Sequence, residues 1–196
     1  MTRHLRINKA SAMKTTLFLT AAIGLLAAGP SLAQVAVAGP ISVSGNVPAL
    51  CAFGQTDTLI GSFEMGVLID TTTGLLRGDL AAADKVITGS FCNSSSSLNV
   101  TASRMAAQNF TGVVPANFSS AIDFTATATG WTPTAAAYQT GFVGTQAAAS
   151  QNQPQPTAGV ITLKVGTFAT QGGASLRPVA DESYRGTVTL TLTPTS

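Results

Sequence analysis

Residues 187–193 read Thr187-Val188-Thr189-Leu190-Thr191-Leu192-Thr193, and this stretch decides the fold class. Valine and leucine occupy every second position, and threonine occupies the others. Because successive side chains of a β-strand point to opposite faces, this period of two gives one apolar face and one hydroxyl-bearing face. The pattern is typical of a half-buried antiparallel strand.

Four upstream segments have the same character, and we predict strands over residues 85–92, 97–103, 121–129 and 159–170. A serine-rich turn separates the first two, as in a hairpin with a longer loop. Residues 138–156, rich in Gln, Ala and Gly with two prolines, predict a loop. Residues 70–84 predict a loop with at most one turn of helix. Short strands joined by Gly, Pro and Asn turns, without a sustained helical period, predict an all-β protein built as a β-sandwich.

The first 33 residues have the order of a secretory signal peptide. A head with four basic side chains precedes the uncharged run 15–29, and the small residues of Ser31-Leu32-Ala33 follow. The uncharged run is shorter than the roughly 20 residues that span a bilayer. We therefore predict cleavage after Ala33, export of the remaining chain, and no stable membrane insertion after cleavage.

Charge and histidine content exclude several functions for the chain that remains after cleavage. Residues 34–196 hold eight acidic and six basic side chains, a formal net charge of −2, and no histidine. This balance removes the electrostatic basis for binding nucleic acid or anionic lipid. General acid–base catalysis near neutral pH depends most often on histidine, and metal sites need clustered ligands, whereas the acids here are scattered. We predict no enzyme activity, no metal site and no cofactor.

The two cysteines, Cys51 and Cys92, allow a single pairing. In an oxidising compartment a disulfide is favoured over the alternative of two buried free thiols. Closing this loop would stabilise the fold by about 4 kcal/mol if chain entropy dominates. A metal site built on these two residues alone lacks a third and a fourth ligand.

Short motifs follow one another along the chain in the order Gly45-Asn46-Val47, Cys51, Ile60-Gly61-Ser62-Phe63, a strand from Val86 to Cys92, Arg104-Met105, and a closing strand from Tyr184. In this order they resemble the secreted subunits of the spore coat protein U family, which is related to the chaperone-usher pilins. The chain departs from the family pattern at Gly186, where Asp is common, and at its end, which lacks a terminal aromatic residue.

The resemblance implies an immunoglobulin-like, pilin-type β-sandwich that is incomplete and takes its last strand from another chain. A periplasmic chaperone fills the open groove first, and the arm of a like subunit replaces it at the outer-membrane usher. The implied organisation is a signal peptide over residues 1–33, a donor arm over 34–46 and one sandwich domain over 47–196. The implied location is the periplasm in transit, then the cell surface or the extracellular space.

The segment 34–46 is uncharged and suits the role of the arm. The candidate donor residues are the apolar ones that alternate with smaller residues: Val35, Val37, Ile41 and Val43. The candidate groove edge is the apolar face of the last strand: Val188, Leu190 and Leu192. The arm also fits the first strand of the chain's own sandwich, or an untethered terminus.

We therefore predict a structural subunit of a bacterial surface polymer, pilus-like or coat-like, in a homo- or hetero-polymer. The alternative is a monomeric secreted binding module with carbohydrate as its candidate ligand. In that module Trp131 or Tyr138 would stack on a sugar, although both rings also suit sealing a sheet edge. A hydrolase is a weaker alternative, because no Gly-x-Ser-x-Gly or Ser-x-x-Lys motif follows residue 33.

Overall fold

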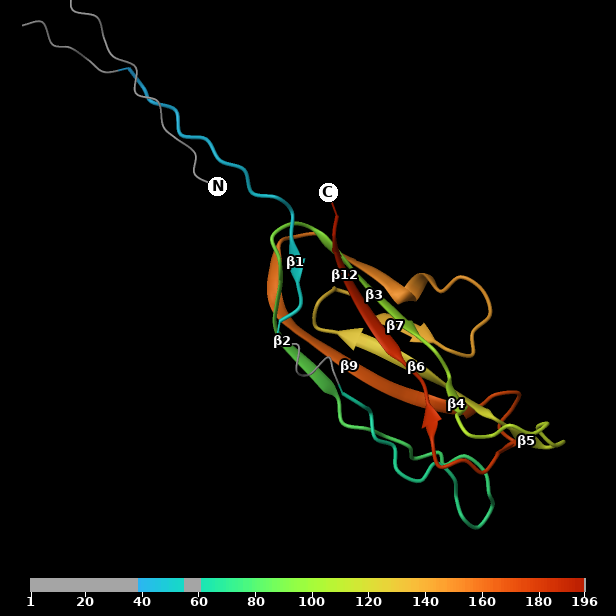
Figure 1. Cartoon of the computed structure of the whole chain (residues 1–196). Coiled ribbons are helices and arrows are strands. Elements are labelled where there is room, and N and C mark those ends of the chain that lie inside the picture. The colour runs from blue at the N-terminus through green and yellow to red at the C-terminus, as the bar shows by residue number, and fades with distance from the viewer. Residues whose placement is uncertain (1–38, 55–60, 196) are drawn as a thin grey trace, which may run out of the picture. The chain divides into compact units, whose positions relative to one another are not determined.

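The chain folds as an all-β protein, and the computed structural model describes it over residues 39–54 and 61–195 (Figure 1). The elements in these ranges are β1 (Cys51–Ala52), β2 (Lys85–Cys92), β3 (Ser96–Ala102), β4 (Met105–Ala107), β5 (Phe118–Ser119), β6 (Ala121–Thr129), β7 (Ala136–Gln139), the 3-10 helix η2 (Ala147–Ala149), β8 (Ser150–Gln153), β9 (Thr157–Thr170), β10 (Arg177–Pro178), β11 (Tyr184–Arg185) and β12 (Val188–Pro194). The signal peptide predicted over residues 1–33, and Val35 and Val37 of the predicted arm, lie outside the described residues.

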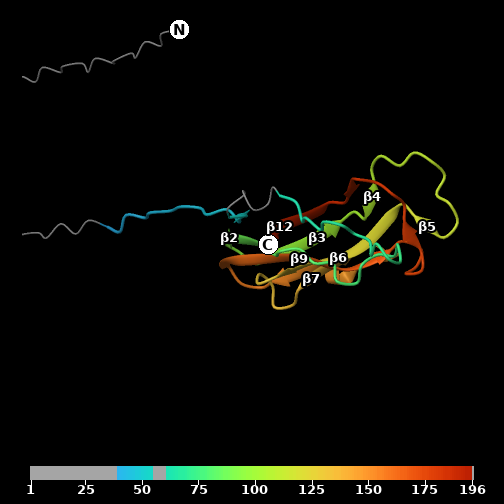
Figure 2. The ribbon, with the colours of Figure 1, turned by 90° about the horizontal axis from the view of Figure 1, so that it is seen from below.

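Two antiparallel sheets make up most of the unit that begins at Gly45. The larger sheet has the order β1-β2-β9-β6-β4-β11, with β7 also paired to β6. The smaller sheet has the order β12-β3-β8. Figure 2 shows β12 and β3 on one side of β9, β6 and β7. A two-residue parallel pair of β5 and β10 lies apart from both sheets.

One hydrophobic core joins the two sheets. Its buried members include Ile87 of β2, Leu98 and Val100 of β3, Phe124 of β6 and Ile161 of β9. These residues come from the apolar positions of the alternating segments, as expected for strands with one buried face. Trp131 is also buried in this core.

Two neighbouring strands pass from one sheet to the other. β3 leads into β4 through Ser103 and Arg104, and β11 leads into β12 through Gly186 and Thr187. The two corners are joined by a 2.9 Å hydrogen bond from the amide of Ser103 to the carbonyl of Thr187. A Cβ at position 186 would lie 2.6 Å from the Ser103 carbonyl oxygen, so this close crossing requires glycine.

A bulge in β2 brings the second cysteine into the core. Thr88 and Gly89 together lie opposite one residue of β9, because the register shifts between Ile87 and Ser90. The extra residue reverses the alternation of side chains, so Ile87 and Cys92 are both buried although five positions separate them. The disulfide between Cys51 and Cys92 is formed, which confirms the predicted pairing.

The five predicted strands are confirmed as β2, β3, β6, β9 and β12, each within two residues of its predicted bounds. The loop predicted over residues 138–156 is wrong in part, because η2 and β8 lie within it. β8 reads Ser-Gln-Asn-Gln and therefore has no apolar alternation. Over residues 70–84 no helix forms, and a bridge between Ile69 and Leu76 closes a small hairpin instead.

Replacing Gly54 with alanine should destabilise the fold strongly. The Gly54 amide donates to the Ser90 hydroxyl at 3.1 Å, and an added Cβ would lie 1.7 Å from the Thr88 carbonyl oxygen. Because that atom belongs to the backbone, the bulge itself must shift. We expect Gly54→Ala to lower the free energy of unfolding by about 2 kcal/mol or more in urea titrations.

The matched control is Gly159→Ala in β9, where an added Cβ meets nothing within 4 Å. This substitution should change the free energy of unfolding by less than about 1 kcal/mol. Equal effects of the two substitutions would show that Gly54 is not packed closely against the Thr88 carbonyl.

Candidate functional site

A large slot opens beside the last two strands, and its lining combines apolar residues with charged ones such as Lys85, Arg177 and Arg185. It has a volume of ≈ 1660 Å³. Its floor consists of side chains from the larger sheet: Ile87, Met105, Phe124, Leu163, Val165 and Phe168. Residues 184–190, from β11 and the first half of β12, line one side, and residues 61–69 line another. Residues 177–183 also contribute to its lining.

The free edge of β12 borders this slot. Among the described residues, β12 pairs with β3 alone. Two hydrogen bonds at the ends of the β12–β3 pair set its pattern: the Thr195 amide donates to the Ser95 carbonyl, and the Ser103 amide donates to the Thr187 carbonyl. The odd-numbered residues along β12 are therefore those whose backbone groups bind β3. In an antiparallel ladder the intervening residues direct their N–H and C=O groups to the opposite edge. The backbone of Val188 and Leu190 therefore points to the free edge.

The facing segment is extended but belongs to no sheet. Phe63 and Met65 are half-buried, whereas Ser62 and Glu64 are exposed, which is the alternation of a strand. No backbone group of Gly61–Gly66 pairs with another described backbone group. The Lys85 ammonium lies 5.7 Å from the centroid of the Phe63 ring, within the range of a cation–π contact. The slot thus has unpaired backbone on both of its long sides.

A bulge between β6 and β9 shapes the floor. Thr167 and Phe168 of β9 together lie opposite Phe124 of β6, because the register shifts between Asp123 and Thr125. Thr167 adopts a φ of 51°, an uncommon conformation for a β-branched residue. Because the extra residue reverses the alternation, Phe168 lines the slot, and its ring centroid lies 6.1 Å from that of Phe124.

Near the C-terminal end of β12 the neighbouring element is β1, which contacts β12. Just before β1, the side chain of Asn93 forms hydrogen bonds with both a backbone N–H and a backbone C=O, as a neighbouring strand would. Its Oδ1 accepts from the amide of Leu50 at 2.7 Å, and its Nδ2 donates to the carbonyl of Pro48 at 2.8 Å. The Asn93 amide also donates to the Leu50 carbonyl at 3.0 Å. Residues 48–50 are therefore held immediately before the disulfide.

Asp181 organises one part of the slot lining. Its carboxylate accepts hydrogen bonds from the backbone amides of Ser183, Asn109 and Phe110 at 2.7, 2.7 and 2.9 Å. These hydrogen bonds, that from Ser183 first, lower the pKa of Asp181. Burial, with the charge of Asp181, raises the pKa of Tyr184 to about 12, and its hydroxyl donates to the Val179 carbonyl at 2.9 Å.

The predicted groove-edge residues divide into two groups. Val188 and Leu190 line the slot, whereas Leu192 does not. All three pack against the core. Of the predicted arm residues within the described ranges, Ile41 is 89% exposed and Val43 is 97% exposed.

Sequence reasoning missed most of the floor. In the sequence, Met105 belongs only to an Arg-Met motif, and Phe124 only to the strand predicted over residues 121–129. Phe168 could not be assigned to a face, since the bulge at Thr167 reverses the alternation on which such assignments depend.

Trp131 does not offer a surface to a ligand. It is 1% exposed, and its Nε1 donates to the hydroxyl of buried Ser96 at 3.2 Å. Its carbonyl accepts from Gln153 Nε2 at 2.7 Å. The Trp131 ring therefore belongs to the core, and the half-buried Tyr138 packs against that core.

Comparisons with protein-family models, with curated proteins and with solved structures find no significant match to this chain. Within residues 39–54 and 61–195, no helix is long and apolar enough to cross a membrane. The same residues contain no cluster of three or more His, Cys, Asp or Glu side chains placed to hold a metal ion.

Acid should release the loops that Asp181 joins. Because folding lowers the pKa of this carboxyl, its contribution to stability is present above the unfolded value and is lost as the pH falls through the folded value. We expect hydrogen exchange at the amides of Asn109 and Phe110 to accelerate in that acidic range, as measured by NMR. Asp181→Asn should show faster exchange than the wild-type protein already at neutral pH, since it keeps one acceptor oxygen for N–H groups that two carboxylate oxygens serve.

The exposed neighbour provides the control for this prediction. Glu182→Gln removes the same charge one position away, and the exchange profile of Asn109 and Phe110 should stay that of the wild-type protein. Unchanged exchange in Asp181→Asn would mean that the carboxylate does not anchor these loops.

Proposed function

We propose that the slot accepts a β-strand from another chain and that this protein is an exported structural subunit of a bacterial surface polymer. The observation that carries the proposal is the free edge of β11 and β12 beside a floor of core side chains. An extended peptide added to a sheet edge gains main-chain hydrogen bonds, and pockets for its alternate side chains give specificity. The slot offers both at one place.

The occupant that we propose is the arm over residues 34–46 of a second copy. The arm carries no charged side chain, and its apolar residues alternate with smaller ones along the sequence. Burying four side chains of this kind would contribute about 6–12 kcal/mol before the costs of ordering and association.

The backbone of the slot also suits a strand. A donor lying between β12 and the segment 61–66 would have partners on both sides, the groups of Val188 and Leu190 on one and the unpaired segment on the other. The side chains at alternate positions of the donor would then face the floor. Such an insertion joins the two long sides of the slot.

We further propose that the two sheets form an immunoglobulin-like, pilin-type sandwich that lacks its last strand. Two features support this assignment: the antiparallel pairing throughout both sheets, and the crossing of adjacent strands between them at Ser103 and Gly186. The resemblance of the short motifs to the spore coat protein U family points the same way.

This fold assignment implies the partners. A slot with an apolar floor and a free sheet edge is prone to aggregation, so a periplasmic chaperone would have to fill it before assembly. An outer-membrane usher would then mediate the exchange for the arm of a like subunit. The disulfide and the signal-like order of residues 1–33 support export through the periplasm.

Charge placed on one face of the arm tests the exchange. Ile41→Asp with Val43→Asp puts two carboxylates on the face that would enter the slot, and we expect polymers to disappear. Ser42→Asp with Ser44→Asp adds the same charge to the opposite face and should leave polymer formation within about threefold of the wild-type rate. Light scattering after size-exclusion chromatography measures both, with electron microscopy of the products.

Three results would contradict the proposal. The wild-type protein could be a folded monomer whose own arm occupies the slot, which protection of Ile41 from proteolysis would reveal. Both charged pairs could leave polymers intact, so that the arm is not the connector. Both could abolish polymers equally, so that the alternation of the arm has no role.

A further inference from the structure

We propose that Arg104, Asp123 and Thr140 form a positioning site that sets the shape of the slot floor and so selects one apolar side chain of the incoming strand. This inference rests on the function proposed above, since it concerns the same slot. None of the three residues lines the slot. They come from distant parts of the chain and meet only in the folded structure. They act through the floor residues Met105 and Phe124.

The three residues meet where one edge of β6 changes its partner. Thr125–Ala128 of β6 pair with β7, whereas Ala121 and Ile122 pair with β4. Asp123 and Phe124 lie between these two ladders and have no strand pairing on that edge. A gap of this kind leaves backbone groups that other partners must satisfy.

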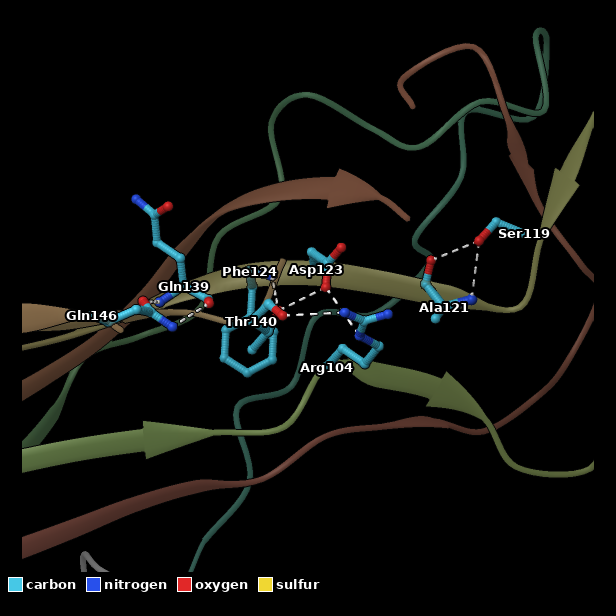
Figure 3. Close-up of polar contacts among 8 residues, drawn as sticks. All are labelled: Arg104, Ser119, Ala121, Asp123, Phe124, Gln139, Thr140 and Gln146. Carbon is cyan, nitrogen blue, oxygen red and sulfur yellow. Dashed lines mark hydrogen bonds and ion pairs between the residues drawn. The ribbon is translucent and has the colours of Figure 1, made fainter. Parts of the chain in front are cut away.

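Thr140, directly after β7, satisfies both backbone groups of Phe124. Its amide donates to the Phe124 carbonyl at 2.9 Å, and its hydroxyl accepts from the Phe124 amide at 2.9 Å (Figure 3). The same hydroxyl donates to Oδ1 of Asp123 at 3.0 Å. The hydroxyl thus takes the place of the carbonyl that a regular ladder would present to Phe124.

Arg104 binds both Asp123 and Thr140. Its Nε lies 3.3 Å from Oδ1 of Asp123, and its Nη2 donates to the Thr140 carbonyl at 3.3 Å (Figure 3). The Asp123 side chain is only 17% exposed, so its charge needs this cationic partner. Arg104 stands at the corner between β3 and β4, so the site ties that corner to β6 and to the end of β7.

The opposite face of the same residues is the slot floor. Met105 follows Arg104 and Phe124 follows Asp123, and adjacent side chains of extended backbone point to opposite faces. Met105 and Phe124 accordingly line the slot. Phe124 is 5% exposed and packs on Phe168, so a shift of its backbone moves the floor at one point along the slot.

Losing the Thr140 hydroxyl should therefore change selectivity as well as affinity. The Phe124 amide would have no acceptor, and the end of β7 would be free to move. A displaced Phe124 alters the pocket for the one donor side chain above it. A loss of overall stability, in contrast, lowers the competent fraction and weakens every donor by the same factor.

The test uses the full chain with its own arm disabled by Ile41→Asp and Val43→Asp. The probe is a fluorescent peptide of residues 34–46, with four variants in which Val35, Val37, Ile41 or Val43 is replaced by alanine. Fluorescence anisotropy gives Kd for each of the five peptides. In the parent protein each ratio of variant to wild-type Kd measures how well the floor holds one side chain.

Thr140→Val should weaken the wild-type peptide by about tenfold and shrink one of the four ratios at least threefold, leaving the others unchanged. Thr140→Ser keeps the hydroxyl and should restore the ratios of the parent. Thr127→Val, on the same face of β6 and outside the site, is the matched control and should alter none of them. Arg104→Gln changes a half-exposed side chain and should shrink the same ratio. It replaces Thr140→Val in the test if that variant does not fold.

Equal weakening of all five peptides by Thr140→Val or by Arg104→Gln would overturn the inference, because the site would then be structural only. Ratios identical to those of the parent would overturn it as well. Failure of every peptide to bind the parent protein is a separate result: it overturns the proposed function, and this inference with it.

Discussion

At the free edge of β12, unpaired backbone groups lie beside apolar side chains, and the two need different partners. Water can satisfy the backbone groups of Val188 and Leu190, but it cannot satisfy the apolar side chains of the floor beside them. An apolar side chain could cover the floor but would leave the backbone groups without partners. A segment with polar backbone and apolar side chains at alternate positions would meet both requirements, which supports the β-strand proposed above as the occupant.

Two β-bulges, one in β2 and one in β9, shape the larger sheet near the slot. The bulge at Thr88 and Gly89 turns Cys92 inward to the disulfide, which holds β1 against β2. The bulge at Thr167 turns Phe168 toward Phe124. In both places a single extra residue reverses the alternation of side chains. The first bulge thereby supports the core, and the second adds Phe168 to a floor that regular strand positions otherwise provide.

The sequence predicts the regular parts of this fold well because each has one apolar face. β12 and β6 alternate so cleanly that their burial could be read directly from residue order. β8 could not be found in this way, since its inward residues are glutamines, one of which binds the carbonyl of Trp131. The slot floor needs contacts between distant residues, such as Arg104 with Thr140, which no local pattern indicates. The arm and the groove edge came from the motif resemblance, and the exchange between them stays a prediction.

The anchoring of residues 48–50 has a mechanical consequence for a polymer joined through its arms. In the polymer proposed above, tension on the arm would enter the unit at Pro48, where the Asn93 side chain accepts from the Leu50 amide and donates to the Pro48 carbonyl. At the following residues the load passes to a covalent sulfur–sulfur link and from there into β2, which is paired to the long β9. The load would therefore not depend on the hydrogen bonds of the two-residue strand β1.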